Sequence, residues 1–398
     1  MTKVLMFGWE FPPQSTGGLG TACYGLTKAL SSLGTQITLV LPTTEGTSAE
    51  FLKLVGANAR VRTIKTPMRP YMTSQQYSVH RGRSTLYGHT LFEEVSRYAD
   101  AAERIAMEES FDVIHCHDWL TYEAGIRAKK VSNKPLVVHV HATEFDRTGG
   151  LGVNQQVYNI EMKGMRLADH VIAVSNYTKG IVTSRYAISP EKVSVVHNAV
   201  EKLQTPMHES PEEFGIKRHS KVVLFLGRMT LQKGPDYFIY AAMKVLEKEP
   251  ETRFVMAGTG DMEGFIINKA AEFGIADKVL FTGFLKGEDV NRAYRMADVF
   301  VMPSVSEPFG LTALEAINNG TPVIMSKTSG VSEIVSHCLK VDFWDINQLA
   351  NKIIAVLRYG ELKSELAQNA ENEVSKMSWR SAAQKCMDIY GRVIAGMA

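Results

Sequence analysis

The stretch VFVMPSVSEPFGLTALEA, residues 299–316, contains one complete structural unit. Residues 299–302 form a short, continuously apolar run, which is typical of a strand buried on both faces of a sheet. The loop residues 303–310 follow, and Pro308 fits at the start of a helix that continues through Ala316. The stretch therefore predicts a strand, a turn and a helix in the order that builds parallel sheets.

Short apolar runs of the same kind recur along the chain and alternate with longer amphipathic stretches. They are residues 4–7, 37–41, 113–115, 136–139, 171–174 and 193–196, and then 222–226, 253–257, 279–282, 299–302 and 323–325. Strands that alternate with helical patterns indicate repeated strand–helix–strand units. The predicted fold class is α/β, with doubly wound parallel sheets.

The series of strands breaks at residues 201–219, which are polar and contain prolines. Such a composition is typical of a linker or a surface connection. A length of 398 residues also favours two domains. We therefore predict one doubly wound domain over 1–200, a linker over 201–219, and a second domain over 220–378. A last helix over 379–398 could pack on either domain.

Composition excludes several classes of protein. Hydrophobic residues make up 45% and charged residues 22% of the chain, which is ordinary for a globular protein and excludes disorder. A net charge of +2 is too balanced for a general nucleic-acid binder. The four cysteines lie far apart, which indicates reduced thiols and a cytoplasmic location. No apolar run reaches the roughly 18 residues of a membrane span, and a strand at the N-terminus predicts that no signal peptide is present.

Two glutamates flank the predicted start of the helix in the opening stretch. Glu307 is expected in the loop, and Glu315 two turns inside the helix. The free amides of Gly310, Leu311 and Thr312 would point at an anion. One carboxylate could meet sugar hydroxyls and the other a ribose diol, with a diphosphate between them. The alternative is a pair of surface glutamates.

Two cations follow the strand at 222–226, in the sequence Gly227-Arg228-Met-Thr-Leu-Gln-Lys233-Gly234. Arg228 and Lys233 would lie at the carboxyl edge of the sheet, where they could hold a diphosphate. As surface charges they would be unremarkable. The glycines at 258 and 260 end the next strand and are compatible with a nucleotide that approaches the backbone closely.

The first half of the chain has a glycine cluster of its own, TGGLG at residues 16–20, between a strand and a helix. Such a turn can bind an anion at the positive end of the helix. It matches neither the dinucleotide-binding fingerprint nor a P-loop. A tight turn that simply needs glycine is the alternative.

His117-Asp118-Trp119 stands at the carboxyl end of another strand, where α/β sheets place their ligands. This combination suits a sugar, because the carboxylate accepts hydrogen bonds from hydroxyls and the indole packs on the C–H face of the ring. His141 ends the next strand, just before Glu144, and is expected to form hydrogen bonds in an active site.

Four histidines, at positions 115, 117, 139 and 141, occupy these two strands with a spacing of two residues. Residues two apart in a strand face the same side, so a zinc site is conceivable. Structural zinc sites favour close C-x-x-C or H-x-x-x-H spacing, and these histidines show neither. The sequence therefore predicts no metal.

Together these motifs resemble the family 4 glycosyltransferases of the GT-B fold and, more loosely, glycogen and starch synthases. The resemblance spans the whole chain and is carried most specifically by the Arg228/Lys233 pair and by Glu307 with Glu315, eight residues apart. It implies two Rossmann-like domains that face a cleft, with the last helix crossing back to the first domain. It also implies a nucleotide-diphospho-sugar donor, retention of anomeric configuration and no metal or other cofactor.

The resemblance also implies roles for individual residues. His141, Arg228, Lys233 and Glu307 match catalytic positions, and the two cations would stabilise the departing diphosphate. The implied donor-binding residues are Gly18, Arg228, Lys233, Glu307, Phe309, Gly310, Leu311, Thr312 and Glu315. The implied acceptor-binding residues are Asp118, Trp119 and Glu144. Bacterial glycogen synthases have a lysine before the glycine turn, whereas this chain has Ser15 and Thr16, which weakens the assignment to that enzyme.

The expected activity is transfer of a sugar, glucose above all from ADP- or UDP-glucose, to a carbohydrate acceptor such as an α-glucan. One alternative is a transferase of the same mechanism that acts on a small molecule, a lipid-linked glycan or a cell-surface polysaccharide. It predicts a membrane-facing patch, for which residues 73–89 are the candidate, so peripheral membrane contact stays open. Two further alternatives are a nucleotide-sugar epimerase, which needs no acceptor, and a regulator that only binds the donor.

Overall fold

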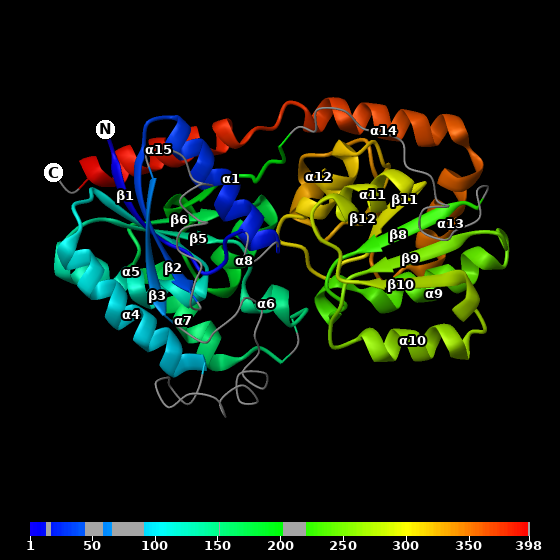
Figure 1. Cartoon of the computed structure of the whole chain (residues 1–398), viewed down its shortest axis with the longest axis horizontal. Helices are drawn as coiled ribbons and strands as arrows, with labels where there is room; N and C mark the ends of the chain where they lie inside the picture. The colour runs from blue at the N-terminus through cyan, green and yellow to red at the C-terminus, as the bar shows by residue number, and fades with distance from the viewer. Residues whose placement is uncertain (13–16, 44–58, 66–90, 151, 202–219, 397–398) are drawn as a thin grey trace. The chain divides into compact units, whose positions relative to one another are not determined.

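The computed structural model describes residues 1–12, 17–43, 59–65, 91–150, 152–201 and 220–396 (Figure 1). Within them the chain forms two compact units. The first comprises Met1–Glu144, Val153–Asn198 and Trp379–Ala398, and the second comprises Phe145–Gly152 and Ala199–Ser378. Thr16, the candidate membrane patch at 73–89 and nearly all of the predicted linker lie outside the described residues.

The first unit is built on a seven-stranded parallel sheet with the order β3-β2-β1-β4-β5-β6-β7. Its strands are β1 (Lys3–Phe7), β2 (Gln36–Thr43), β3 (Ala59–Lys65), β4 (Val113–His117), β5 (Leu136–Val140), β6 (His170–Ala173) and β7 (Val193–Val195). Its helices are α1 (Gly18–Ser32), α4 (Leu91–Glu108), α5 (Trp119–Ser132), α7 (Gln155–Leu167), α8 (Asn176–Arg185) and α15 (Trp379–Ala395). The short helix α6 (Glu144–Arg147) stands where the chain leaves this unit.

The second unit is built on a six-stranded parallel sheet with the order β10-β9-β8-β11-β12-β13. Its strands are β8 (Val222–Leu226), β9 (Arg253–Ala257), β10 (Val279–Gly283), β11 (Val299–Met302), β12 (Val323–Ser326) and β13 (Leu339–Val341). Its helices are α9 (Pro235–Leu246), α10 (Glu263–Glu272), α11 (Glu288–Met296), α12 (Leu311–Asn318), α13 (Ile346–Arg358) and α14 (Gly360–Val374).

Each sheet has one point where the strand order reverses. In the first unit the chain leaves β1 toward β2 and leaves β4 toward β5, although β1 and β4 are neighbours. In the second unit the same holds for β8 and β11. A crevice opens at such a point beyond the carboxyl ends of the strands, and ligands of open α/β sheets bind there. The loops after β4, β8 and β11, together with the helices α5 and α12, carry most of the predicted site residues.

The last helix belongs to the first unit. It packs against α1 so closely that a Cβ on Gly25 would overlap the indole of Trp379. Near its other end the Tyr390 hydroxyl lies 2.6 Å from Nδ1 of His115, in the middle of the sheet. Burial of Trp379 and Tyr390 therefore holds the C-terminal helix on this unit.

The structure differs from the predicted elements in three places. It adds β3, a strand at the sheet edge whose sequence ARVRTIK alternates in polarity, and β13, which has only 3 residues. Helix α12 begins at Leu311 and not near Pro308, because Gly310 turns the chain with φ +110° directly before it. Among the described residues no helix combines the length and the apolar character that crossing a membrane requires.

Candidate active site

Two loops of the second unit meet at its reversal point. The amide of Val305, after β11, donates to the carbonyl of Gln232, after β8, at 2.9 Å. Gly234 has φ +65°, and a Cβ there would overlap the carbonyl oxygen of Pro303. Only glycine combines this backbone conformation with such a close approach. The conformation of one loop therefore fixes the other.

These loops bring the predicted Lys233 and Glu307 together. Lys233 Nζ lies 2.6 Å from Glu307 Oε2, and the side chains are only 20% and 8% exposed. Ser304 Oγ donates to the same carboxylate oxygen at 3.1 Å. Arg228 precedes Lys233 in the same loop. It is half-buried, and it donates to Gln232 Oε1 at 3.3 Å. The site thus presents a lysine whose position is set by a buried carboxylate.

The other predicted donor residues lie on or beside α12. The Glu315 carboxylate accepts from the Tyr294 hydroxyl at 3.2 Å, and burial raises the pKa of Glu315. Because the helix begins at Leu311, Glu315 lies about one turn inside it and not two. The side chain of Phe309 is 3% exposed and belongs to the core, so only its backbone is available to a ligand.

The glycines after β9 have a structural explanation. A Cβ on Gly258 would overlap the carbonyl oxygen of Gly227, and a Cβ on Gly260 would overlap that of Met229. At these two positions glycine therefore allows the loops after β8 and β9 to pack closely. The approach of a nucleotide to this backbone stays a prediction.

In the first unit Asp118 joins the ends of β4 and β5. Its Oδ1 accepts from the amides of His141 at 2.7 Å and Ala142 at 3.2 Å, and its own amide donates to His139. Asp118 has φ +59°, a conformation that costs a non-glycine residue about 1–3 kcal/mol. Strain of this kind persists where the surroundings impose it, and here the carboxylate positions the backbone of His141.

The four histidines of β4 and β5 form a stacked array. Ring centroids are 4.4 Å apart for His115 and His117, and 4.2 Å apart for His139 and His141. His117 Nδ1 lies 2.9 Å from His141 Nε2. Burial lowers the pKa of all four rings, and that of His117 falls to about 3. The array is therefore neutral near pH 7.

The remaining predicted residues of the first unit differ in what they offer. Trp119 is 8% exposed and packs on Phe92, with ring centroids 6.0 Å apart, so little of the indole face is open to a sugar. Glu144 is 7% exposed, and its Oε1 accepts from the Asn154 amide at 3.2 Å. Gly18 begins α1, and a Cβ there would meet nothing within 4 Å, which leaves its backbone accessible.

Several residues of these sites were not predicted from the sequence. Ser304 holds Glu307, and Gln232 contacts Arg228 and the loop after β11. Cys23, on α1, reaches the histidine array. Ser304 and Gln232 stand inside predicted motifs and could have been singled out by their polarity, whereas nothing in the sequence links Cys23 to the histidines.

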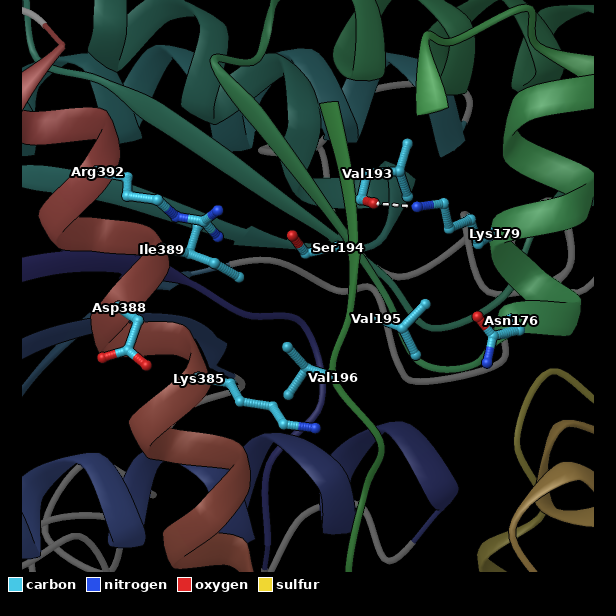
Figure 2. Close-up of a pocket in the computed structure, with 10 residues that line it drawn as sticks. All are labelled: Asn176, Lys179, Val193, Ser194, Val195, Val196, Lys385, Asp388, Ile389 and Arg392. Carbon is cyan, nitrogen blue, oxygen red and sulfur yellow. Dashed lines mark hydrogen bonds between the residues drawn. The ribbon is translucent and has the colours of Figure 1, made fainter. Parts of the chain in front are cut away.

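A separate groove of about 410 Å³ runs along β7, between α8 and α15 (Figure 2). Its charged lining consists of Lys179, Lys385 and Arg392 together with Asp388. Lys179 Nζ donates to the carbonyl of Val193 at 2.7 Å. The groove contains none of the predicted site residues, so it is a distinct basic feature of the first unit.

Two family models match the chain in sequence. The model described as Glycosyltransferase Family 4 matches residues 16–202, and the model described as Glycosyl transferases group 1 matches residues 207–373. The first match covers the unit with the histidine array, and the second covers the unit with Lys233 and Glu307.

Solved structures share the fold. Sucrose-phosphate synthase from Thermosynechococcus elongatus superposes with a TM-score of 0.80 at 20% identity and covers 100% of both chains. Anabaena HepE in complex with UDP and glucose superposes with a TM-score of 0.77 at 18% identity, over 98% of this chain and 100% of the other.

Relatives by sequence agree with the fold. An uncharacterized glycosyltransferase of Methanocaldococcus jannaschii is 32% identical, over 98% of this chain and 97% of the relative. A glycogen synthase of Mycobacterium tuberculosis is 27% identical over 84% and 80%. A D-inositol 3-phosphate glycosyltransferase of Salinispora arenicola is 30% identical over 72% and 69%. The chain therefore belongs to the family 4, group 1 glycosyltransferases and has their GT-B fold.

Proposed function

We propose that this glycosyltransferase moves glucose from a nucleoside-diphospho-glucose to a glucan, with retention of anomeric configuration. The observation that carries the proposal is the buried pair of Lys233 and Glu307 at the reversal point of the second sheet. A chain that binds a nucleotide-sugar needs a cation for the diphosphate and a hydrogen-bond acceptor for the sugar hydroxyls, and this pair supplies both.

Lys233 would act on the leaving group. When the bond between the anomeric carbon and the diphosphate breaks, negative charge builds up on the phosphate oxygens. An ammonium group already held by Glu307 and shielded from water stabilises that charge without having to reorganise. Arg228, which Gln232 orients, can add a second cation to the same diphosphate.

Glu307 and Glu315 would hold the two sugars of the donor. Lys233 and Ser304 already donate to Glu307 Oε2. These hydrogen bonds fix the carboxylate and leave Oε1 for hydroxyls of the transferred sugar. The carboxylate of Glu315 is fixed by Tyr294 and can accept from the ribose. The amides at the start of α12 would direct the positive end of the helix toward the phosphates.

His141 matches a catalytic position of the family and would contact the transferred sugar. Its imidazole is neutral because burial lowers its pKa, so it can donate a hydrogen bond without adding charge. Asp118 fixes the backbone of His141 through its carboxylate. We therefore assign Asp118 a positioning role, in place of the direct acceptor contact that the resemblance implied.

The glucan acceptor is supported by the relative named glycogen synthase. A small polar acceptor is supported to a similar degree by the relative named D-inositol 3-phosphate glycosyltransferase. Both readings use the same donor site, so the choice of acceptor is a separate question from the donor.

The experiment that tests the proposal measures release of nucleoside diphosphate from ADP-, UDP- and GDP-glucose in the presence of maltooligosaccharide, of inositol phosphate, and of neither. We expect release from a glucose donor that depends on the acceptor and that lengthens the oligosaccharide. Release that depends on inositol phosphate instead would move the acceptor to small molecules. Conversion of the donor sugar with no acceptor present would indicate an epimerase and contradict the proposal.

A further inference from the structure

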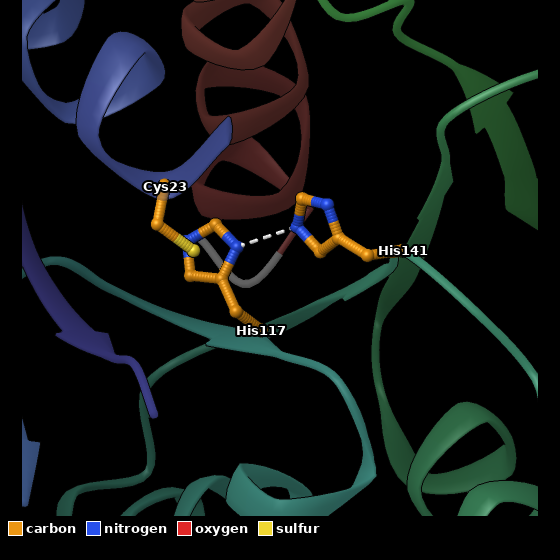
Figure 3. Close-up of side chains that lie close together, drawn as sticks. All are labelled: Cys23, His117 and His141. Atoms are coloured by element: carbon orange, nitrogen blue, oxygen red, sulfur yellow. Dashed lines mark hydrogen bonds between the residues drawn. The ribbon is translucent and has the colours of Figure 1, made fainter. Parts of the chain in front are cut away.

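A thiol and two imidazoles converge at the carboxyl end of β4. Cys23 reaches this point from α1, His117 is the last residue of β4, and His141 directly follows β5 (Figure 3). One potential ligand atom of each side chain lies within 4.8 Å of the others. The three residues are 1%, 0% and 9% exposed, so the cluster is buried and opens only at His141.

The spacing of the cluster fits a tetrahedral metal ion. Two nitrogens that each lie about 2.1 Å from a zinc ion are about 3.4 Å apart in that geometry. The observed separation of His117 Nδ1 and His141 Nε2 is 2.9 Å. Small rotations of the side chains would therefore admit an ion between these rings, and the sulfur is near enough to become a third ligand.

The surroundings of the cluster favour a cation. The buried carboxylates of Asp118 and Glu10 act electrostatically on Cys23. An ion that displaced the thiol proton into solvent would form a thiolate and would be attracted by the same carboxylates. In addition, His117 Nε2 is buried and has no hydrogen-bond partner among the described residues. An imidazole nitrogen without a hydrogen-bond partner is costly to bury, and packing alone does not explain it.

We propose that Cys23, His117 and His141 bind a divalent ion of the zinc class, and that the bound ion inhibits transfer because it occupies His141. Zinc combines readily with one thiolate and two imidazoles, and a fourth position would stay open for water. The inhibitory half rests on the proposed role of His141 at the transferred sugar. The binding half does not depend on it.

The test of binding uses the full-length protein, stripped of metal and titrated with Co²⁺, which reports its ligands by absorption. We expect one Co²⁺ per chain and a sulfur-to-cobalt charge-transfer band in the near ultraviolet. Cys23→Ser should abolish the band, whereas Cys338→Ser, a matched change at a buried cysteine of the second unit, should keep it. Cys23→Ala provides a second variant if the serine form does not fold.

Two results would overturn the site. Failure of the wild-type protein to bind Co²⁺ would do so. Co²⁺ binding that shows no sulfur band, and that Cys23→Ser leaves unchanged, would also do so. The ion would then occupy the neighbouring group of His115, His117 and His139.

The test of inhibition adds Zn²⁺ to the transfer assay. We expect Zn²⁺ to stop transfer in the wild-type protein, and Cys23→Ser to raise the half-inhibitory concentration more than about tenfold, since the loss of even an outer-shell partner weakens metal binding by that much. Cobalt binding with transfer unaffected by Zn²⁺ would overturn the inhibitory half. If no donor supports transfer at all, the proposed function fails while the cobalt result still decides the metal site.

Discussion

The histidine array makes the first unit sensitive to acid. The pKa of His117 is lowered from 6.5 to about 3 by burial, so the unfolded chain binds a proton on this ring at a pH where the folded chain does not. A group of this kind contributes its full stability above its unfolded pKa and loses it as the pH falls. At pH 5 this ring alone should lower the free energy of unfolding by about 2 kcal/mol relative to pH 8.

The other three rings make the free energy of unfolding depend more steeply on pH. Burial lowers the pKa of His115, His139 and His141 as well, so protons taken up on unfolding add to that of His117. The free energy of unfolding should therefore fall by more than about 1.4 kcal/mol per pH unit below pH 6, the slope for one proton.

Denaturant unfolding followed by tryptophan fluorescence measures this effect. Trp9, Trp119 and Trp379 are buried in the first unit, and Trp344 of the second unit is already 59% exposed, so the signal reports mainly the first unit. His139→Leu should make the pH dependence shallower, because both ring nitrogens of His139 are buried without partners among the described residues. This reasoning would be refuted if the free energy of unfolding fell between pH 7 and pH 5 by less than the uptake of one proton predicts. It would also be refuted if His139→Leu were as sensitive to acid as the wild-type protein.

Three further predictions concern the second unit. Gly234→Ala should destabilise it by about 1–3 kcal/mol in thermal unfolding because of the positive φ and the overlap with Pro303, whereas Gly264→Ala, where a Cβ meets nothing within 4 Å, should not. Glu307→Ala should lower transfer by orders of magnitude with little change in melting temperature, and a comparable loss of folded protein would make its role structural. Transfer should persist in EDTA, because Lys233 and Arg228 neutralise the diphosphate; activity lost to EDTA and restored by Mg²⁺ would contradict that role.

Much of the fold was predictable because buried parallel strands are continuous apolar runs. Nine of the eleven predicted runs lie wholly within observed strands, and residues 222–226 coincide with one. The strand β3 was missed because an edge strand exposes one side. Its arginines at 60 and 62 bind Glu108, the last residue of α4, and Glu109, which follows it. Its sequence signal is alternation of polar and apolar residues, which a search for continuous apolar runs does not detect.

The site was predictable where its residues follow one strand. Lys233 and Glu307 were recognised because each stands in a loop after a buried strand, and adjacent strands bring those loops together. Two features needed coordinates. The argument against zinc relied on the lack of close ligand spacing in the sequence, but helix α1 brings Cys23 to His117 from far along the chain. The roles of Gly258 and Gly260 also depended on the loop that packs against them.

The central claim is that Lys233 binds the diphosphate of the donor, and calorimetry with UDP and ADP, each compared with its parent nucleoside, tests it directly. Lys233→Met should weaken diphosphate binding by about 2 kcal/mol, about 30-fold, and leave nucleoside binding almost unchanged. Lys327→Met, at an exposed lysine paired with Asp342 in the same unit, is the matched control and should change neither. If Lys233→Met binds the diphosphates as tightly as the wild-type protein does, the donor site lies elsewhere.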